Sequence, residues 1–255
     1  MSAAATTRRL VQQFLICLTF YTRIPAGRLI DSEQDFASSQ WAAPLVGVVI
    51  GMVAGSVFLA AELAAVPASV SAGLCLTALI VLTGALHEDG LADAADGFGG
   101  GSSKGEKLEI MRDSRLGSFG ALALIVSCLI RWACLTALAS GGTVFVGLIA
   151  AHCASRAMIP LFMLQVSPAR SDGLSAGVVS PDKGTVIVTL LFGIVSLLIL
   201  GPLAAAVCTA LLAGWLVAMK FLCERQIGGQ TGDVIGALQQ GAEILVLVTV
   251  TAFFV

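Results

Sequence analysis

Three aspartates at helical spacing are the strongest chemical feature of the sequence. Asp89, Asp93 and Asp96 stand at i, i+4 and i+7, so a helix there would align their carboxylates on one face. Neighbouring anions repel one another, and a divalent cation relieves that repulsion. Oxygen donors without cysteine favour Mg²⁺. We therefore predict a magnesium site on these aspartates, with Gly90 and Gly97 leaving room for a substrate. The alternative is a solvated acidic loop.

Two arginines follow shortly after the aspartates. Arg112 and Arg115 flank Asp113 just before an apolar stretch. A planar guanidinium binds phosphate oxygens through two parallel hydrogen bonds. We expect both arginines to contact phosphate close to the metal site. The alternative is that they only anchor the following helix at the membrane surface.

Two further arginines lie inside apolar stretches. A charge at membrane depth is costly, so it usually faces the interior of a helix bundle or an aqueous cavity. Arg156 shares its stretch with His152 and Ser155, which indicates a polar stripe. For Arg131 we expect a structural role, or a side chain that reaches back to the membrane surface.

A glycine-rich turn covers residues 228–233. Such a turn at the start of a helix offers free backbone N–H groups to an anion. We expect its amides and the Thr231 hydroxyl to contact a phosphate or ribose, and Asp233 to join the metal shell or orient a ligand. The alternative is a sharp connection in which Asp233 caps the last helix.

The elements that position these residues are apolar helices. Of the 255 residues, 57% are apolar and 12% charged, with a mean hydropathy of +0.96, whereas soluble domains are about a quarter charged. We predict an all-α, polytopic transmembrane bundle forming one domain over residues 1–255, with an N-terminal interfacial helix at residues 8–22. About seven stretches approach the roughly 20 residues of a membrane span: Ala42–Ala61, Ala68–Leu86, Gly120–Ala139, Thr143–Leu164, Thr185–Leu200, Leu203–Leu222 and Gly236–Val255.

The basic residues predict the orientation of these spans. With the N-terminus inside, the inside connections hold nearly all Lys and Arg, while the outside turns near Glu62–Pro67, Ser140–Gly142 and Gly201–Pro202 hold none. Lys and Arg favour the cytoplasmic side. We therefore predict an N-in, C-out protein of the inner membrane, with its reactive residues at the cytoplasmic face.

Composition also excludes several classes of protein. The net charge of −2 gives no reason to expect nucleic acid as a partner. The seven cysteines are scattered without a C-x-x-C pair, which argues against disulfides and a thiolate zinc site. A transporter would carry polar residues near the middle of several spans, whereas here they gather at one face.

Two segments together resemble the cobalamin synthase family, the adenosylcobinamide-GDP ribazoletransferases. They are Thr83–Gly97 and Leu108–Gly117. Some members of that family carry an acid where Gln240 stands. The resemblance runs in order along most of the chain, continuing at Phe20–Pro25, Pro44–Gly47, Ser155-Arg156 and Gly228–Asp233.

The resemblance implies a Mg²⁺-dependent transferase of the bilayer in the last assembly step of vitamin B12. A ribose hydroxyl of α-ribazole, or of its 5′-phosphate, attacks the phosphorus of adenosylcobinamide-GDP nearer the cobinamide, and GMP leaves. His87 is a candidate general base, with a carboxylate as the alternative. The implied catalytic residues are His87, Asp89, Arg112 and Arg115. The implied substrate contacts are Arg23, Asp113, Arg156, Gly229, Gln230, Thr231 and Asp233.

Two questions stay open from the sequence. A phosphotransferase acting on another nucleotide-activated alcohol has the same reaction form and the same needs for metal and arginine. The preferred acceptor and the oligomeric state, including a homo-oligomer, are also undetermined.

The orientation is testable with reporter fusions. A fusion after Ser103 should report the cytoplasm, and fusions after Gly141 and Val255 should report the outside, because the connections rich in Lys and Arg stay inside. Alkaline phosphatase and fluorescent-protein activities give the two readouts. A cytoplasmic reading at Val255 would contradict seven spans.

Overall fold

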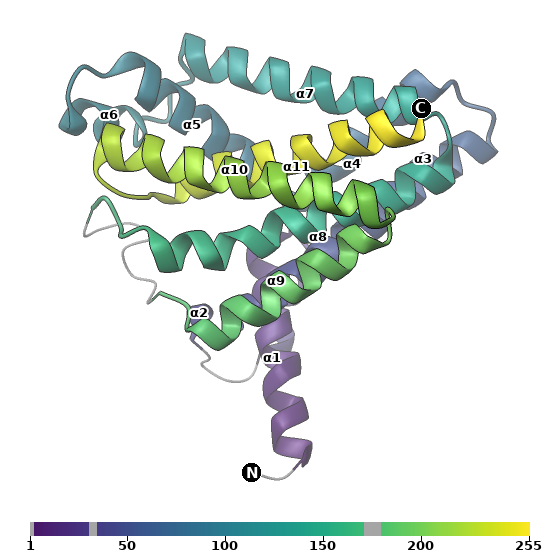
Figure 1. The fold of residues 1–255 in the computed structure, drawn as a ribbon, viewed down its shortest axis with the longest axis horizontal. Helices are drawn as coiled ribbons and strands as arrows, with labels where there is room; N and C mark the ends of the chain where they lie inside the picture. Colours follow the sequence, from purple (N-terminus) through teal and green to yellow (C-terminus); the bar gives the residue numbers. More distant parts are fainter. Residues whose placement is uncertain (1–2, 31–34, 171–179) are drawn as a thin grey trace.

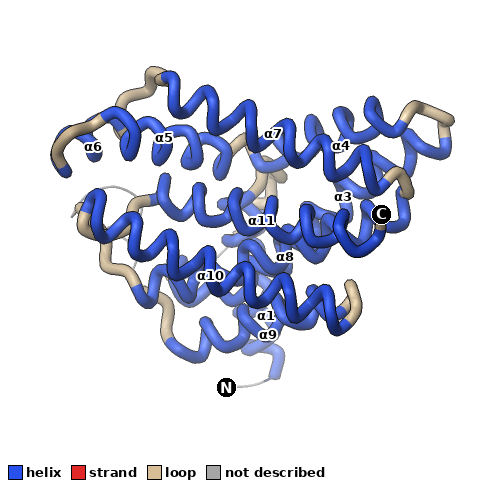
Figure 2. The backbone as a smooth tube through the Cα atoms, turned by 45° about the horizontal axis from the view of Figure 1, so that its top comes forward, coloured by secondary structure: helices blue, strands red, loops and turns tan. Residues whose placement is uncertain are grey.

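The protein is an all-helical bundle in this computed structural model, which describes residues 3–30, 35–170 and 180–255. Within those ranges no β-strand occurs, and one isolated bridge joins Pro168 and Gln230. Figures 1 and 2 show how the helices pack. In chain order the elements are α1 (Ala3–Tyr21), η1 (Gly27–Leu29), α2 (Phe36–Ser39), η2 (Gln40–Ala42), α3 (Ala43–Leu63), α4 (Ala68–Thr83), α5 (Leu86–Gly100), α6 (Lys104–Ile110), α7 (Ser118–Leu138), α8 (Gly141–Gln165), α9 (Lys183–Leu198), α10 (Pro202–Ile227) and α11 (Gly232–Phe254).

Each predicted span coincides with a helix, and this confirms the all-α prediction. The structure offers fewer spans than the seven predicted. By length and composition, the bent pair of α4 and α5 counts as at most one span, and five other helical segments among the described residues suffice to cross a membrane: Phe36–Leu63, α7, α8, α10 and α11. The apolar helix α9 is shorter, with 16 residues. The break predicted at Gly201-Pro202 is confirmed, because α9 ends at Leu198 and α10 begins at Pro202.

The second predicted span ends earlier than expected. Helix α4 stops at Thr83, and the chain bends by 88° into α5. Gly84 and Ala85 both adopt left-handed backbone conformations, with φ of 64° and 57°. Glycine takes this conformation without steric cost. Figures 1 and 2 place α5 and α6 near the turn between α10 and α11, at the end of the bundle opposite the C-terminus.

The outer faces of several helices are strongly apolar. Leu122, Ile125 and Leu129 are exposed along α7, as are Ile194 and Leu198 along α9. Continuous apolar surfaces of this kind are rare on soluble monomers. They suit helices whose outer faces contact lipid chains.

Helix α1 buries side chains against the bundle mainly in its C-terminal half. Cys17 and Tyr21 are buried, whereas residues 4–11 are exposed. Figure 1 shows the N-terminal half projecting away from the other helices. The interfacial location predicted for residues 8–22 stays a prediction.

Helix α8 lies at the centre of the bundle and packs tightly against α3. Gly47, Gly51 and Gly55 recur every four residues along α3, so their positions form one face. A β-carbon at Gly51 would lie 2.7 Å from Cα of Ile149, and one at Gly55 would lie 2.9 Å from Cα of Phe145. Small residues at this spacing let two helix backbones approach within an apolar environment.

A buried ion pair ties α5 and α11 to α7. Nη1 of Arg131 donates to Oε1 of Glu88 at 3.0 Å and to Oε1 of Glu243 at 3.2 Å. All three side chains are almost completely buried. The structural role predicted for Arg131 is confirmed, and the alternative that it reaches the membrane surface is wrong, because both partners lie inside the bundle.

Further contacts link Glu243 to side chains of α8. Oε2 of Glu243 accepts a hydrogen bond from Nε2 of Gln239 at 2.9 Å and lies 3.3 Å from Nδ1 of His152. Nη1 of Arg156 lies 3.0 Å from the same His152 nitrogen. The polar stripe predicted on this helix therefore faces the bundle interior. We call Glu88, Arg131, His152, Arg156 and Glu243 the buried charge network.

We predict that Arg131→Met lowers the free energy of unfolding by about 3–5 kcal/mol, because it leaves Glu88 and Glu243 buried without their cation. Thermal unfolding in detergent measures the loss. Leu129→Met, on the exposed side of the same helix, is the matched control and should change stability little. Equal melting temperatures for the two variants would contradict a stabilising role for the network.

Candidate active site

The three aspartates of α5 stand on a helix, as their spacing predicted. α5 lies directly against α11, since β-carbons added at Gly90 and Gly236 would fall 3.0 Å from the Asp233 carbonyl oxygen and 3.1 Å from Cα of Gly90. Its missing side chain admits the backbone of α11, which brings Asp233 close to Asp89 and Asp93. Gly90 also borders the cavity described below, so the expectation that it leaves room for a substrate stays a prediction.

Gly97 also serves helix packing. A β-carbon there would lie 2.6 Å from Cγ of Met111 and 2.9 Å from the carbonyl oxygen of Lys107. The space beside Gly97 is thus filled by α6 and the residue after it. The expectation that Gly97 leaves room for a substrate is therefore wrong.

Asp96 differs from the other two aspartates. Its carboxylate is buried and accepts hydrogen bonds from the amides of Gly117 at 2.7 Å and Gly120 at 2.8 Å. It therefore binds the free N–H groups at the start of α7. Across the described ranges, no group of three or more His, Cys, Asp or Glu side chains is placed to hold a metal ion. The structure does not bring the three carboxylates together as one ready-made site.

Asp89 and Asp93 keep the donor chemistry expected for magnesium. Asp89 is exposed, and Asp93 is partly exposed. The Asp93 carboxylate also interacts electrostatically with the nearby carboxylates of Asp89, Asp96 and Asp233. Mg²⁺ is commonly held by one or two carboxylates together with substrate phosphates and water. The residues present therefore fit that ion through two carboxylates rather than three.

A cavity of about 400 Å³ opens beside Asp89. We call it the α5–α11 cavity. Carboxylates reach it from Asp89 and Asp233, and an imidazole from His87. Its remaining lining is mostly apolar, contributed by Phe20, Tyr21, Phe36, Leu86, Gly90, Ile159, Met163, Gly232 and Ile235.

His87 is the side chain in this cavity with an unused polar atom. The residue is 3% exposed, and its Nδ1 has no hydrogen-bond partner. A buried polar atom without a partner carries a free-energy cost, and such atoms call for an explanation. The hydroxyl of neighbouring Tyr21 is already used, donating to Oε1 of Gln40 at 2.7 Å. The His87 ring lines the cavity, while its Nδ1 atom is buried within the protein without a hydrogen-bond partner.

The glycine-rich turn is pinned by the segment that follows α8. Gln230 donates its amide to the Ser167 carbonyl and accepts from the Ala169 amide, both at 2.9 Å. The Gly228 amide bonds to the end of α10. A β-carbon at Gly229 would lie 3.0 Å from Cα of Ala169. The expectation of free amides for an anion is wrong for Gly228 and Gln230.

The last helix is capped by Thr231, not by Asp233. The Thr231 hydroxyl accepts from the Val234 amide at 3.3 Å and donates to the Asp233 carboxylate at 3.1 Å. The same carboxylate oxygen accepts from Nη2 of Arg170 at 3.0 Å. The capping alternative for Asp233 is therefore wrong. The carboxylate instead lines the α5–α11 cavity, where it is oriented by Thr231 and Arg170.

The arginines before α7 are exposed, and Arg115 pairs with Asp113. Nε of Arg115 donates to both Asp113 oxygens at 3.0 Å, and these hydrogen bonds hold the pKa of the Asp113 carboxyl below its usual range. Arg115 and Asp96 line a separate hollow of about 420 Å³. Arg112 is exposed on the same connection. None of these four residues lines the α5–α11 cavity.

The other two predicted substrate arginines lie in different environments. Arg23 is exposed, its backbone amide bonds to the Leu82 carbonyl at 2.7 Å, and its guanidinium lies over Gly84 at the corner before α5. Arg156 is 1% exposed and is not part of the cavity lining. The structure therefore gives Arg156 a place in the buried charge network and no direct route to a substrate.

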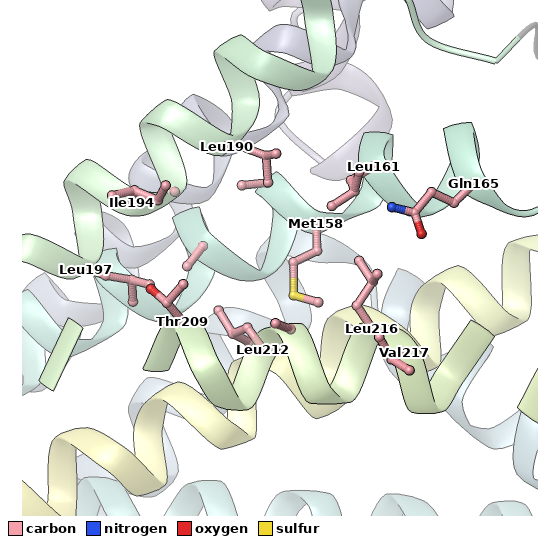
Figure 3. A pocket seen from close by; sticks show the side chains of 14 residues that line it. Met158, Leu161, Gln165, Leu190, Ile194, Leu197, Thr209, Leu212, Leu216 and Val217 are labelled. Carbon is pink, nitrogen blue, oxygen red and sulfur yellow. The ribbon is translucent and has the colours of Figure 1, made fainter. Parts of the chain in front are cut away.

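A second cavity lies between α8, α9 and α10, and Figure 3 shows it. It measures about 380 Å³ and is lined largely by apolar side chains such as Met158, Leu190 and Leu212. None of the described residues that line it is ionisable. It lacks the charged groups that phosphate chemistry requires.

Several residues that border the site carry no local sequence pattern that indicates it. Arg170 lies in a polar connection, and no motif there pairs it with Asp233. Phe36 follows a polar segment without any periodic pattern. Phe20 and Tyr21 belong to the motif Phe20–Pro25, but nothing in that motif indicates that their rings line a cavity.

The comparisons with known proteins agree with one another. The model of the family described as cobalamin-5-phosphate synthase matches residues 13–251. Among the relatives named adenosylcobinamide-GDP ribazoletransferase, that of Mesorhizobium japonicum is 46% identical over 240 residues, covering 94% of this chain and 93% of the relative. That of Bradyrhizobium diazoefficiens is 43% identical over 250 residues, covering 97% and 96%.

A more distant relative extends the same match. The protein of that name from Ralstonia nicotianae is 36% identical over 249 residues, covering 95% of this chain and 96% of the relative. No solved structure matches this chain. Because the similarity spans nearly the full length of the chain and of these relatives, this chain belongs to the cobalamin-5-phosphate synthase family.

Proposed function

We propose that this protein joins adenosylcobinamide-GDP to α-ribazole, or to its 5′-phosphate, with release of GMP. The oxygen of a ribose hydroxyl forms a bond to the phosphorus nearer the cobinamide, and the bond from that phosphorus to the GMP oxygen breaks. The family membership and the relatives' shared name support this reaction. The observation that carries it to a site is that the carboxylates of Asp89 and Asp233 and the imidazole of His87 line one cavity.

His87 is the proposed acceptor of the hydroxyl proton. A neutral imidazole has one nitrogen whose lone pair can accept a proton, and the His87 ring lines the cavity. Asp89 lines the same cavity and is the alternative base. A general base must come within hydrogen-bonding reach of the proton that it removes, and both side chains border the cavity in which the hydroxyl would bind.

Asp89 and Asp93 are the proposed holders of Mg²⁺. Bound there, the ion would neutralise phosphate oxygens of the substrate as negative charge builds on the leaving GMP. Asp233, held by Arg170 and Thr231, would orient the acceptor or complete the metal shell. Asp96 would act indirectly, by fixing α5 against the start of α7.

The exposed arginines are the proposed phosphate ligands. The Arg23 guanidinium lies beside Gly84 at the corner before α5. Arg112 and Arg115 lie on the connection between α6 and α7. Arg115 would exchange its pairing with Asp113 for phosphate oxygens, which a guanidinium binds in the same forked geometry. We further propose that this end of the bundle faces the cytoplasm and that the protein resides in the inner membrane.

The reaction is tested with purified protein in detergent. Adenosylcobinamide-GDP is incubated with α-ribazole or its 5′-phosphate, and GMP and the cobalamin product are quantified by liquid chromatography. We expect equal amounts of both products, dependence on Mg²⁺, and loss of activity with EDTA that Mg²⁺ restores. GMP release without a corrinoid product would show hydrolysis and contradict the proposed transfer.

The proposed metal ligands give a separate prediction. Asp89→Asn and Asp93→Asn should each lower turnover at least about a hundredfold, the scale of a lost electrostatic contact to the transition state. Glu109→Gln, an exposed acid on α6, is the control and should retain activity. Wild-type turnover in both aspartate variants would remove these carboxylates from the mechanism.

The Asp96→Asn variant should behave differently from the Asp89→Asn and Asp93→Asn variants. Asp96→Asn weakens the two amide contacts at the start of α7, so thermal stability should fall while the Mg²⁺ concentration for half-maximal activity stays near the wild-type value. A large rise in that concentration, with normal stability, would return Asp96 to the metal shell.

A further inference from the structure

The geometry points to the α5–α11 cavity as the site that binds the flat base of the acceptor nucleoside. The inference rests on the proposed function and assigns one substrate to one cavity. The base would lie against an aromatic wall, with its ribose toward the carboxylates. Four observations support this assignment: the aromatic geometry, the apolar lining, the polar side chains of the lining, and the size of the cavity.

Aromatic rings from three elements form one side of the cavity. The centroids of Phe20 and Phe36 are 4.5 Å apart, and those of Phe20 and Tyr21 are 4.9 Å apart in an edge-to-face arrangement. The ring of His87 follows, 5.7 Å from that of Tyr21. Aromatic side chains are the surfaces on which proteins stack nucleic-acid bases. The base of α-ribazole is a fused bicyclic aromatic system and offers the same kind of flat face.

The rest of the lining distinguishes this base from guanine. Leu86, Ile159, Met163 and Ile235 present no side-chain hydrogen-bonding group. Guanine has donors and acceptors around most of its edge, and an apolar lining would leave several of them unpaired at a substantial cost. The dimethylbenzimidazole base has two methyl groups and one free ring nitrogen. The apolar lining therefore favours the acceptor base over the guanine of the other substrate.

The polar groups of the cavity suit the remainder of a nucleoside. The imidazole of His87, which lines the cavity, can bond to the free ring nitrogen or to a ribose hydroxyl, according to which of its nitrogens carries the proton. Asp89 and Asp233 accept hydrogen bonds from hydroxyl groups. A ribose directed toward them would present its hydroxyl beside the proposed base and metal ligands.

The cavity is too small for the corrin macrocycle of the other substrate. A volume of about 400 Å³ lies within the range of small-molecule sites. It accommodates a bicyclic base with a pentose, whereas a corrin macrocycle with its side chains is far larger. The corrinoid must then approach from the exposed side of Asp89 and Asp93.

The test separates the two substrates kinetically. Phe20→Leu and Phe36→Leu keep an apolar side chain but remove the ring, and both residues are partly exposed, so the fold should tolerate the change. We expect the KM for α-ribazole to rise about tenfold, while the KM for adenosylcobinamide-GDP stays within about twofold. Phe221→Leu, on the exposed side of α10, is the matched control and should leave both constants unchanged.

A binding measurement keeps the inference independent of turnover. Calorimetry of α-ribazole with the detergent-solubilised protein, without the corrinoid, should show binding that weakens about tenfold in Phe20→Leu and Phe36→Leu. If the wild-type protein bound α-ribazole in this way but had no transferase activity, the proposed function would be refuted. The assignment of the cavity as a binding site for the base would still hold. A rise in the KM for adenosylcobinamide-GDP alone, or unchanged α-ribazole binding in both variants, would overturn the assignment.

Discussion

The buried charge network is the constraint on which the rest of the structure depends. Two arginines and two glutamates lie in the interior of an apolar bundle, where an unpaired charge is very costly. Arg131 of α7 is therefore held between Glu88 of α5 and Glu243 of α11. His152 links the second of these carboxylates to Arg156 of α8. Four helices meet at this network, and each contributes at least one charged or imidazole side chain.

The network also determines how α5 presents its reactive face. Successive residues of a helix point about 100° apart, so a buried Glu88 turns its neighbour Asp89 outward. Glu88 is 7% exposed, whereas Asp89 is exposed and lines the α5–α11 cavity. Asp96 adds a second restraint seven residues further along, through two amides at the start of α7. With both ends fixed, the rotation of α5 is determined.

The carboxylates of the acidic segment thus have separate tasks. Glu88 neutralises a buried arginine, and Asp96 binds a helix start. Asp89 and Asp93 remain accessible for a cation and a substrate. Asp233 reaches the same region from α11 because Gly90 and Gly236 allow the two backbones to touch. A catalytic site at the end of a helical bundle is assembled from several helix ends in this way.

The sequence by itself determined the helices, the polar end of the bundle and the family, because apolar length, glycine and proline breaks and local motifs are properties of neighbouring residues. It indicated that Arg131 and Arg156 need polar partners, since a charge in an apolar stretch requires them. Only the tertiary structure decided that Glu88 and Glu243 pair with Arg131, that Asp96 binds the start of α7, and that Phe36 and Arg170 border the site. Those contacts join segments far apart in the chain, and helical periodicity sets only which residues share a face, not what that face meets.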